Sequence, residues 1–483
     1  MNKFLQGMKN YTYTDNGALS YKSTLNAVYD LFALGAAYRE RSDEDCIELF
    51  RKAFDDDETY AMKCLFWIRD ARGGAGERRF FRVCMKWLAS EHPDAVRRNL
   101  VYFSDLGRWD DYFCLFDTPL EKEMLAFIKH QIALDVESKT PSLLFKWLPS
   151  CNTSSAQTRE YGHRIRNYLG LNQKQYRKML SKMRQRINVL EKLMSAGEWD
   201  KIIFDKIPSN AGFRYRNAFA RRDVLAQRYA EFAKDKKTKV HADTLYPYEV
   251  VKQALAYNKG NDSEGTQRNM INKYWSNLHD YIQNGVFNGI CVCDVSGSMY
   301  GTPINVALSI GMYCAEKAQG PFANHFITFS MRPELVEFDG PDFVEKIQRT
   351  AAEAPWGMNT NLEATFDLLL DTAINNCCSQ EDIPANLIIV SDMQFDCAVR
   401  GGAYGGTLLE GIRKKWEHYG YKMPSLIFWN VNASSDLIPM KDEDGITFVS
   451  GFSPNLFEQI IQSKSGIDLM YDKLNNERYE GIK

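Results

Sequence analysis

The chain has 483 residues, of which 45% are hydrophobic and 25% charged, and its formal net charge is −2. It is too long for one ordinary domain, and its composition is typical of a folded globular protein. No stretch contains about 18 uninterrupted apolar residues, and the N-terminus lacks the apolar core of a signal peptide, so we expect a cytoplasmic protein with no membrane partner. The 11 cysteines show no metal-ligand spacing, and we expect reduced core residues.

The small net charge conceals a strongly basic segment. Residues 159–239 contain 21 Lys and Arg but only 8 Asp and Glu, an excess of 13 positive charges. The rest of the chain, with 39 basic and 54 acidic residues, is acidic. Such an asymmetry points to an anionic partner for the middle of the chain.

The first half is expected to be helical, because apolar residues recur there at intervals of three and four. The candidate helices cover 20–39, 43–72, 77–93 and 119–138, and basic helices follow over 157–170, 172–200 and 213–237, with one more over 270–283. Many amphipathic helices joined by short turns predict an α-helical ring or solenoid of stacked helix pairs. We find no strict sequence period.

After about residue 286 the pattern alternates between strands and helices. Apolar strand candidates cover 289–295, 325–330, 335–338, 386–392, 425–431 and 446–450; helix candidates cover 304–319, 342–353, 362–375, 407–420 and 453–462. Strands that are apolar throughout and separated by helices indicate a doubly wound, Rossmann-like parallel sheet covered on both faces. The expected domains are therefore 1–285 and 286–483.

A group of oxygen-bearing side chains is expected at the carboxyl ends of these strands, where such sheets bind ligands. Asp294, Ser296 and Ser298 alternate directly after the first strand, so the period of two points them into one crevice. Thr360 and Asp392 fall at equivalent strand or helix ends. Five oxygen donors without His or Cys suit Mg²⁺ or another divalent cation such as Mn²⁺ or Ca²⁺.

This set of three separated motifs resembles the von Willebrand factor A domain and its metal-ion-dependent adhesion site. The resemblance covers about 286–483. It implies that Ser296, Ser298 and Thr360 contact the metal directly or through water, while Asp294 and Asp392 anchor its water shell. It also implies one open coordination position for a carboxylate of a protein partner or another oxyanion.

The motif is also compatible with a helix cap or a catalytic serine. A lone Asp-x-Ser is commonly a helix cap, but the order of the motifs and their strand context favour a metal site. A catalytic serine is not supported, because there is no Gly-x-Ser-x-Gly elbow and no histidine is placed relative to the serines. We therefore expect no enzyme activity.

The basic segment is expected to bind RNA, because Lys and Arg interleaved with aromatic residues offer phosphate contacts and stacking surfaces for unpaired bases. The strongest concentration is in "FRYRNAFARR", where arginines surround Tyr215. The candidate residues are Arg214, Tyr215, Arg216, Arg221 and Arg222, followed by Arg164, Arg166, Lys174, Tyr176, Arg177, Lys178, Lys182, Arg184 and Arg186. Basic helix faces are also commonly just solvated.

The helical half resembles the Ro autoantigen family, whose TROVE domain closes HEAT-like helices into a ring, followed by a von Willebrand A domain. The stretches that suggest it are "LFWIRDARGGAGERRFFR", "LGRWDDYF", "KWLPS" and "FDKIPSNAGFRYRNAFARRD", which look like a divergent bacterial or phage branch. The resemblance implies binding of structured noncoding RNA of the Y RNA type and of single-stranded RNA ends. The function expected is an RNA-binding scaffold forming a ribonucleoprotein.

Two alternatives remain open. In the first, the chain is a metal-dependent protein–protein adaptor without RNA. In the second, it is an RNA-processing enzyme with Mg²⁺, although the motif has one metal and no evident general base. Within the helical half we favour structural roles for the remaining motifs. Trp109 and Tyr112 have core spacing, Arg69 and Arg72 are expected to pair with Asp70, and Glu77 with Arg78.

Overall fold

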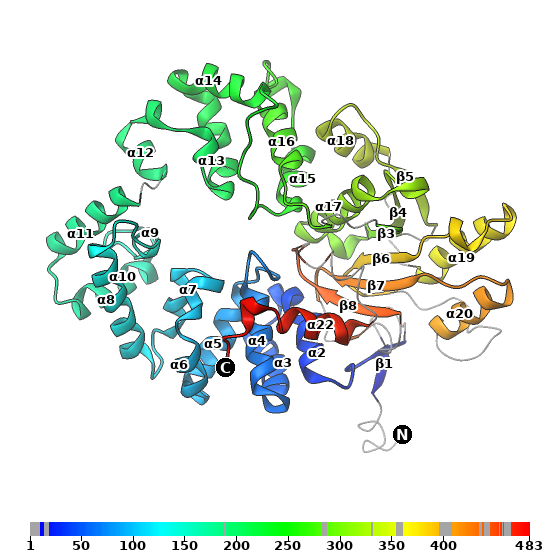
Figure 1. The fold of residues 1–483 in the computed structure, drawn as a ribbon, viewed down its shortest axis with the longest axis horizontal. Helices are drawn as coiled ribbons and strands as arrows, with labels where there is room; N and C mark the ends of the chain where they lie inside the picture. The colour runs from blue at the N-terminus through cyan, green and yellow to red at the C-terminus, as the bar shows by residue number, and fades with distance from the viewer. Residues whose placement is uncertain are drawn as a thin grey trace.

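A computed structural model describes residues 10–13, 19–187, 190–282, 287–329, 332–353, 361–395, 408–433, 437–438, 445–453, 455, 457 and 465–483. An α-helical part is followed along the chain by a part built on a mixed, mainly parallel β-sheet (Figure 1). This arrangement confirms the expected combination of an α-helical half with an α/β half.

A short hairpin and a group of compact helices begin the chain. They are β1 (Tyr11–Tyr13), β2 (Leu19–Tyr21), α2 (Ala27–Leu34), η1 (Gly35–Glu40), α3 (Asp43–Asp56), α4 (Glu58–Arg69), α5 (Arg79–Glu91), α6 (Pro93–Asn99), α7 (Tyr102–Leu106) and η2 (Trp109–Leu115). The stretch expected to be helical over 43–72 divides at Asp57. The side chain of Asp57 accepts a hydrogen bond from the backbone N–H of Tyr60 and so caps α4.

The second group of helices carries the basic segment. It comprises α8 (Glu121–Glu137), α9 (Leu144–Trp147), α10 (Ala156–Tyr168), α11 (Gln173–Arg186), α12 (Leu190–Ala196), η3 (Trp199–Lys201), η4 (Phe204–Lys206), α13 (Ser209–Arg221), α14 (Asp223–Lys234), α15 (Pro247–Leu255), η5 (Lys259–Asn261) and α16 (Thr266–Ser276). Helix α11 starts where Asn172 and Gln175 form a reciprocal capping box. Helix α15 was not predicted from the sequence; Pro247 occupies its first turn and Glu249 completes its cap.

The second half contains all six of the expected strands. They are β3 (Gly289–Asp294), β4 (His325–Phe329), β5 (Glu334–Glu337), β6 (Asn386–Ser391), β7 (Ser425–Asn430) and β8 (Ile446–Ser450), in the order β5-β4-β3-β6-β7-β8. Every pair is parallel except β4 with β5, which is antiparallel. The expectation of a wholly parallel sheet was wrong at this edge. Only four residues join β4 to β5, too few for a crossover connection.

Helices follow the strands as expected. They are α17 (Thr302–Lys317), α18 (Phe343–Glu353), α19 (Leu362–Asn375), α20 (Leu408–His418) and α22 (Gly466–Leu474), with the 3-10 helix η10 (Glu477–Tyr479) near the end. Helix α22 was not predicted, and most of the helix expected over 453–462 lies outside the described residues. Three cysteines of this half, Cys291, Cys293 and Cys314, are buried and free as expected, whereas Cys377 is exposed and Cys378 is half-buried, so the expectation of core cysteines was wrong for this adjacent pair.

The helices form an arc whose two ends both contact the sheet domain (Figure 1). At the first end α2 packs against β8, where the backbone N–H of Phe448 donates to the Tyr29 hydroxyl at 2.9 Å. At the second end α15 packs on α17 and α16 on α18, with the rings of Trp275 and Phe343 stacked at 3.9 Å. The sheet domain therefore bridges the two ends of the helical part.

The two ends of the arc also meet each other. The loop between α4 and α5 brings Gly76 so close to Tyr246 that a Cβ at Gly76 would lie 1.7 Å from the tyrosine hydroxyl oxygen. Next to it, the rings of Tyr248 and Phe452 are 5.3 Å apart, and the Arg39 guanidinium lies 3.7 Å from the Phe452 ring centre. The helical part thus closes on itself at the start of α15.

Candidate functional site

The first candidate site lies where β3 and β6 end side by side. Asp294 is the last residue of β3 and Asp392 directly follows β6. In the sheet, β3 lies between β4, which is the next strand in the chain, and β6. The connections after β3 and β6 leave in opposite directions at this point, and sheets of this kind bind ligands outside the carboxyl ends of such a strand pair.

Asp294 is fully buried and held by hydrogen bonds. Its Oδ1 accepts from the backbone N–H of Ser296 at 2.9 Å, and its Oδ2 accepts from the Ser391 hydroxyl at 2.6 Å. Burial raises the pKa of Asp294 to about 6, although both hydrogen bonds oppose the rise; the nearby Asp392 adds to it.

Asp392 is 2% exposed and connects to the serines. The Ser298 hydroxyl bonds to its carboxylate and lies 3.1 Å from the Ser296 hydroxyl. Burial raises the pKa of Asp392 despite the bond from Ser298. The two carboxylates and the serine hydroxyls therefore form one connected group, of which Ser298 is exposed to solvent.

A backbone conformation that is rare for L residues lies beside this group. Met393, which follows Asp392, has a φ of +65°, and its N–H donates to the Ser391 hydroxyl at 3.1 Å. Left-handed conformations of side-chain-bearing residues are concentrated at functional sites, where the surrounding structure holds them. Here Ser391 bonds both Met393 and Asp294, so it links the two strand ends.

Four of the five expected metal-site residues are brought together: Asp294, Ser296, Ser298 and Asp392. Thr360 lies outside the described residues. The sequence analysis did not predict Ser391 as part of this site. The signal for it is that Ser391 ends an apolar strand, β6, which lies next to the strand that ends at Asp294. Within the described residues, no group of three or more His, Cys, Asp or Glu is placed to hold a metal, so this site depends on its hydroxyl groups.

The donor set fits a hard divalent cation. All of its side-chain donor atoms are oxygens, and they include two buried carboxylates, those of Asp294 and Asp392. Neither carboxylate forms an ion pair with a basic side chain of the described residues. Buried negative charge without a compensating cation is costly, which is why both pKa values rise. A bound Mg²⁺ would supply the missing positive charge.

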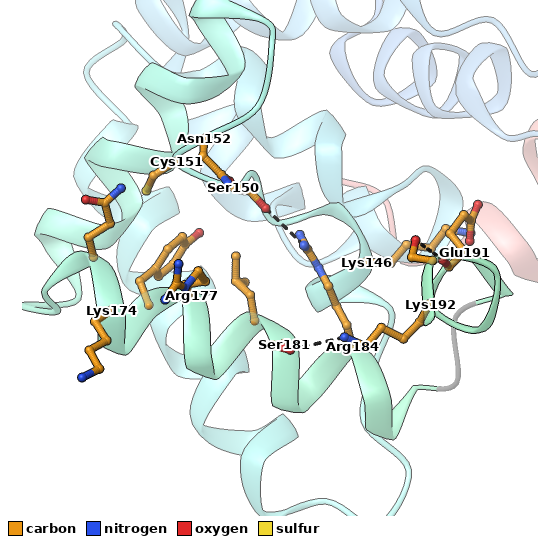
Figure 2. A pocket seen from close by; sticks show the side chains of 14 residues that line it. Lys146, Ser150, Cys151, Asn152, Lys174, Arg177, Ser181, Arg184, Glu191 and Lys192 are labelled. Carbon is orange, nitrogen blue, oxygen red and sulfur yellow. Dashed lines mark hydrogen bonds between the residues drawn. The ribbon is translucent and has the colours of Figure 1, made fainter. Parts of the chain in front are cut away.

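The second candidate site is a basic groove in the helical half (Figure 2). It has a volume of about 850 Å³ and lies between α11, α12 and the loop from α9 to α10. Its charged lining residues are Lys146, Lys174, Arg177, Arg184, Lys192 and Glu191. Five positive charges against one negative charge make this groove attractive to a polyanion.

Eight of the fourteen expected RNA-binding residues are exposed in the structure. They are Lys174, Arg177, Lys178, Lys182, Arg186, Arg214, Arg221 and Arg222. Two of these stand over aromatic rings: the guanidinium of Arg214 is 5.8 Å from the Tyr215 ring centre and that of Arg222 is 4.7 Å from Trp199. The exposed set lies on α11, α13 and the residue that follows α13.

Other members of the expected set are engaged within the protein. Arg164 pairs with Asp117 at 2.7 Å and with Glu121. Arg184 donates to the carbonyls of Phe145 and Leu148 at 2.9 and 2.7 Å. These contacts argue against Arg164 and Arg184 as primary phosphate ligands, and sequence spacing could not reveal them because the partners lie more than 30 residues away.

The remaining members, and the exposed Arg186, also form contacts within the protein. Tyr176 is 1% exposed and its hydroxyl donates to the Pro149 carbonyl at 3.0 Å, so it cannot serve as the stacking surface expected of it. Arg186 donates to the Val136 carbonyl at 2.9 Å near the C-terminus of α8. Arg166 bonds the Asn167 side chain at 2.7 Å, and the Tyr215 hydroxyl bonds Glu191 at 3.3 Å.

Arg216 is 7% exposed. Its Nη1 donates to the Phe213 carbonyl at 2.8 Å, and its Nη2 to the side chain of Gln253. The expectation that Arg216 binds phosphate at the surface was therefore wrong.

Comparison with known proteins places the chain in a family. Residues 14–112 and 122–285 match the family described as "Domain of unknown function (DUF2828)", and residues 288–480 match the one described as "Domain of unknown function (DUF7788)". A protein of Acanthamoeba polyphaga mimivirus, "Uncharacterized protein L728", is 31% identical over an alignment that covers 95% of this chain and 86% of the viral protein. The chain belongs to the DUF2828 family.

None of the helices in the described ranges combines the length and apolar character needed to cross a membrane.

Proposed function

We propose that this protein is an RNA-binding scaffold whose sheet domain docks a partner through a divalent cation. The basic groove carries the proposal, since it gathers five cationic side chains against one acidic side chain in a volume of about 850 Å³. The exposed arginines of α13 and the residue after it extend this basic surface. Together they would hold structured noncoding RNA and its single-stranded ends.

Features of both halves support the resemblance to the Ro autoantigen family, from which the RNA proposal is taken. The helical part follows an arc that returns to its start, as a ring of HEAT-like helix pairs of the Ro type does. The sheet order and the Asp294, Ser296, Ser298 and Asp392 group support a von Willebrand A type domain with an adhesion-type metal site. Mg²⁺ would offer a coordination position to an incoming oxyanion.

Salt-dependent RNA binding tests the proposal. The probe is a short RNA stem–loop with a single-stranded tail, and its affinity for the full chain is measured by fluorescence anisotropy over a range of salt concentrations. Each phosphate contact should contribute about −0.7 to the slope of log K against log salt for single strands. Binding without salt dependence, or no binding, would reject an RNA-binding scaffold.

Charge reversal locates the binding surface. Lys174→Glu combined with Arg177→Glu should weaken RNA binding and make the salt slope shallower by about 1.4, because two phosphate contacts are lost. Lys422→Glu changes an exposed lysine of the sheet domain in the same way and serves as the control. Equal loss in both variants would show only a general effect of net charge.

A second candidate function, a metal-dependent protein–protein adaptor without RNA, is favoured by the surface around the metal site. Tyr300, two residues after Ser298, is 91% exposed, and exposed aromatic side chains are common anchors in protein interfaces. In this case Asp294→Ala abolishes partner capture, whereas charge reversal at Arg214 and Arg221 leaves it unchanged. Partner capture from the source cell extract with and without a chelator measures the difference.

A further inference from the structure

Arginine side chains gather where the start of α5 meets η2. Arg82 and Arg108 contact the same carboxylate, since Nη2 of each lies 2.8 Å from Oδ2 of Asp110. Arg78 is the N-cap residue of α5 and lies about one turn before Arg82, on the same side of the helix. The guanidinium groups of these three arginines are therefore neighbours.

This cluster has more positive than negative charge. Behind Arg82 lies the buried Arg69, and both arginines contact Asp111 at 2.7 Å. Counting Arg69, four arginines share the two carboxylates of Asp110 and Asp111. The cluster therefore carries an excess of two positive charges, which an anion from outside the protein could balance.

The side chain of Arg78 has no partner of its own. It forms neither a hydrogen bond nor an ion pair with the described residues. The expected pair with Glu77 was wrong, because Glu77 bonds Arg39 at 2.9 Å. Partial burial lowers the pKa of Arg78, and the neighbouring arginines, Arg108 most of all, lower it further. A bound anion would stabilise a charged group held in this way.

The two paired arginines keep donors for such an anion. Arg108 uses Nε and Nη2 on Asp110, at 2.9 and 2.8 Å, and its guanidinium lies 4.2 Å from the Trp147 ring centre. Arg82 uses Nε on Asp111 and Nη2 on Asp110. Nη1 of each arginine has no hydrogen-bond partner among the described residues and is open to solvent. These donors are held in place before any ligand arrives.

The excess charge indicates which anion the cluster suits. A phosphate monoester carries about −1.5 to −2 charges near pH 7 and offers three acceptor oxygens. A phosphodiester or a carboxylate carries a single negative charge. Guanidinium groups bind phosphate oxygens through paired N–H donors. A monoester therefore matches the excess of two positive charges best.

We propose that Arg78, Arg82 and Arg108 form a binding site for a phosphate monoester. Arg78 donates a pair of hydrogen bonds to it, and Nη1 of Arg82 and Nη1 of Arg108 add one each. The site shares no lining residue with the basic groove. It therefore does not depend on RNA binding in that groove.

Two pairs of probes that differ only in a phosphate monoester test the site. One pair is adenosine 5′-monophosphate and adenosine, and the other is a short RNA with and without a 5′-phosphate. Their affinities for the full chain are measured by isothermal titration calorimetry at constant ionic strength. We expect the phosphate to strengthen binding about tenfold. A gain in the first pair supports a free nucleotide as ligand, and a gain in the RNA pair alone supports a phosphorylated RNA end.

Arg78→Gln should reduce this gain to about twofold or less. Without ligand its thermal unfolding midpoint should stay the same or rise, because the side chain has no partner in the protein and faces like charges. Arg72→Gln is the matched control. Arg72 is exposed in the loop between α4 and α5, and only its backbone N–H bonds a side chain, that of Asp70. This variant should keep the full gain.

Three results would overturn the site: no gain in either pair, a gain that persists in Arg78→Gln, or an equal loss in Arg72→Gln, which would show only a general effect of charge. None of these affects the RNA proposal, which the salt dependence of stem–loop binding and the charge reversal at Lys174 and Arg177 test separately. Loss of RNA binding there, in turn, would leave the gain for adenosine 5′-monophosphate unchanged.

Discussion

Asp70 and Arg478 are 408 positions apart in the chain and form an ion pair, with Nη2 of the arginine 2.8 Å from Oδ1 of the aspartate. The Tyr479 hydroxyl donates to the other oxygen of Asp70 at 3.0 Å. The carboxylate is 1% exposed. At the very end of the chain, the backbone N–H of Lys483 donates to the Asn99 side chain at 2.9 Å. The C-terminal segment is thus fastened to the first helices.

Asp70→Ala should loosen this attachment. The change leaves Arg478 and the Tyr479 hydroxyl without their shared acceptor, and we expect a loss of about 2 kcal/mol, reduced from the fully buried case because the Arg478 side chain is 34% exposed. The thermal unfolding midpoint should fall, and carboxypeptidase should remove C-terminal residues faster. Asp55→Ala, which removes an exposed partner of Arg51, is the control and should change neither. An unchanged digestion rate in Asp70→Ala would contradict the role assigned to Asp70.

The partners of Asp70 show what the sequence could and could not predict. Apolar periodicity located α4 and α5 because helix formation is decided within a few turns. The expected pairing of Asp70 with Arg69 was wrong, and Arg72 bonds Asp70 through its backbone N–H, at 2.9 Å, instead of forming the expected ion pair. Arg69 bonds Asp111 at 2.7 Å and Asp70 bonds Arg478, and such partners depend on how distant helices pack.

Asp111 is predicted to be the most sensitive charged residue of the helical half. It is fully buried and accepts from the side chains of Arg69 and Arg82, each at 2.7 Å, and from the backbone N–H of Arg108 at 2.8 Å. Asp111→Ala leaves two arginines facing a buried void, and removing one partner of such a group costs about 3–5 kcal/mol. Its unfolding midpoint in urea should fall clearly.

The neighbouring Asp110 provides the comparison. Its side chain is 18% exposed and pairs with Arg82 and Arg108, each at 2.8 Å. Asp110→Ala should cost clearly less than Asp111→Ala because solvent reaches this pair. Equal shifts in the two variants would show that burial does not decide the effect.

The candidate metal site was more predictable than the RNA surface. Alternation after an apolar strand places Asp294, Ser296 and Ser298 on one edge, since strand geometry fixes where side chains emerge. In the basic segment, Lys174 and Arg184 look alike in sequence. One is exposed and the other holds backbone carbonyls, because only the packed loop after α9 brings those carbonyls within reach.

Gly76→Ala tests the closure of the arc. Gly76 has a φ of +71°, and its new Cβ would collide with the Tyr246 hydroxyl. Gly170 has nearly the same φ, +68°, but open space around it, so Gly170→Ala should show the backbone cost alone, about 1 kcal/mol. Gly76→Ala should lower the unfolding midpoint further and increase the radius of gyration in small-angle scattering. Identical behaviour of the two variants would argue against a tight junction at Tyr246.

The titration of Asp294 predicts how the stability of the metal-free protein depends on pH. The pKa of this carboxyl is raised to about 6 in the folded state, against an ordinary value of 3.8 in the unfolded chain. Between these values the folded state holds the proton more tightly, so stability falls as pH rises and is lowest above about pH 6. The difference corresponds to about 3 kcal/mol. The pKa of Asp392 is raised as well and acts in the same direction.

With a chelator present, the thermal unfolding midpoint should therefore decrease between about pH 4 and pH 6, and adding Mg²⁺ above pH 6 should restore it, because the ionised carboxylates then have a cation. Asp294→Asn should flatten the chelated profile, since its amide carries no charge, and should abolish the response to Mg²⁺. Asp339→Asn alters an exposed carboxylate of the same domain and should behave as the unaltered chain does. A Mg²⁺ response that persists in Asp294→Asn would place the cation elsewhere in the protein.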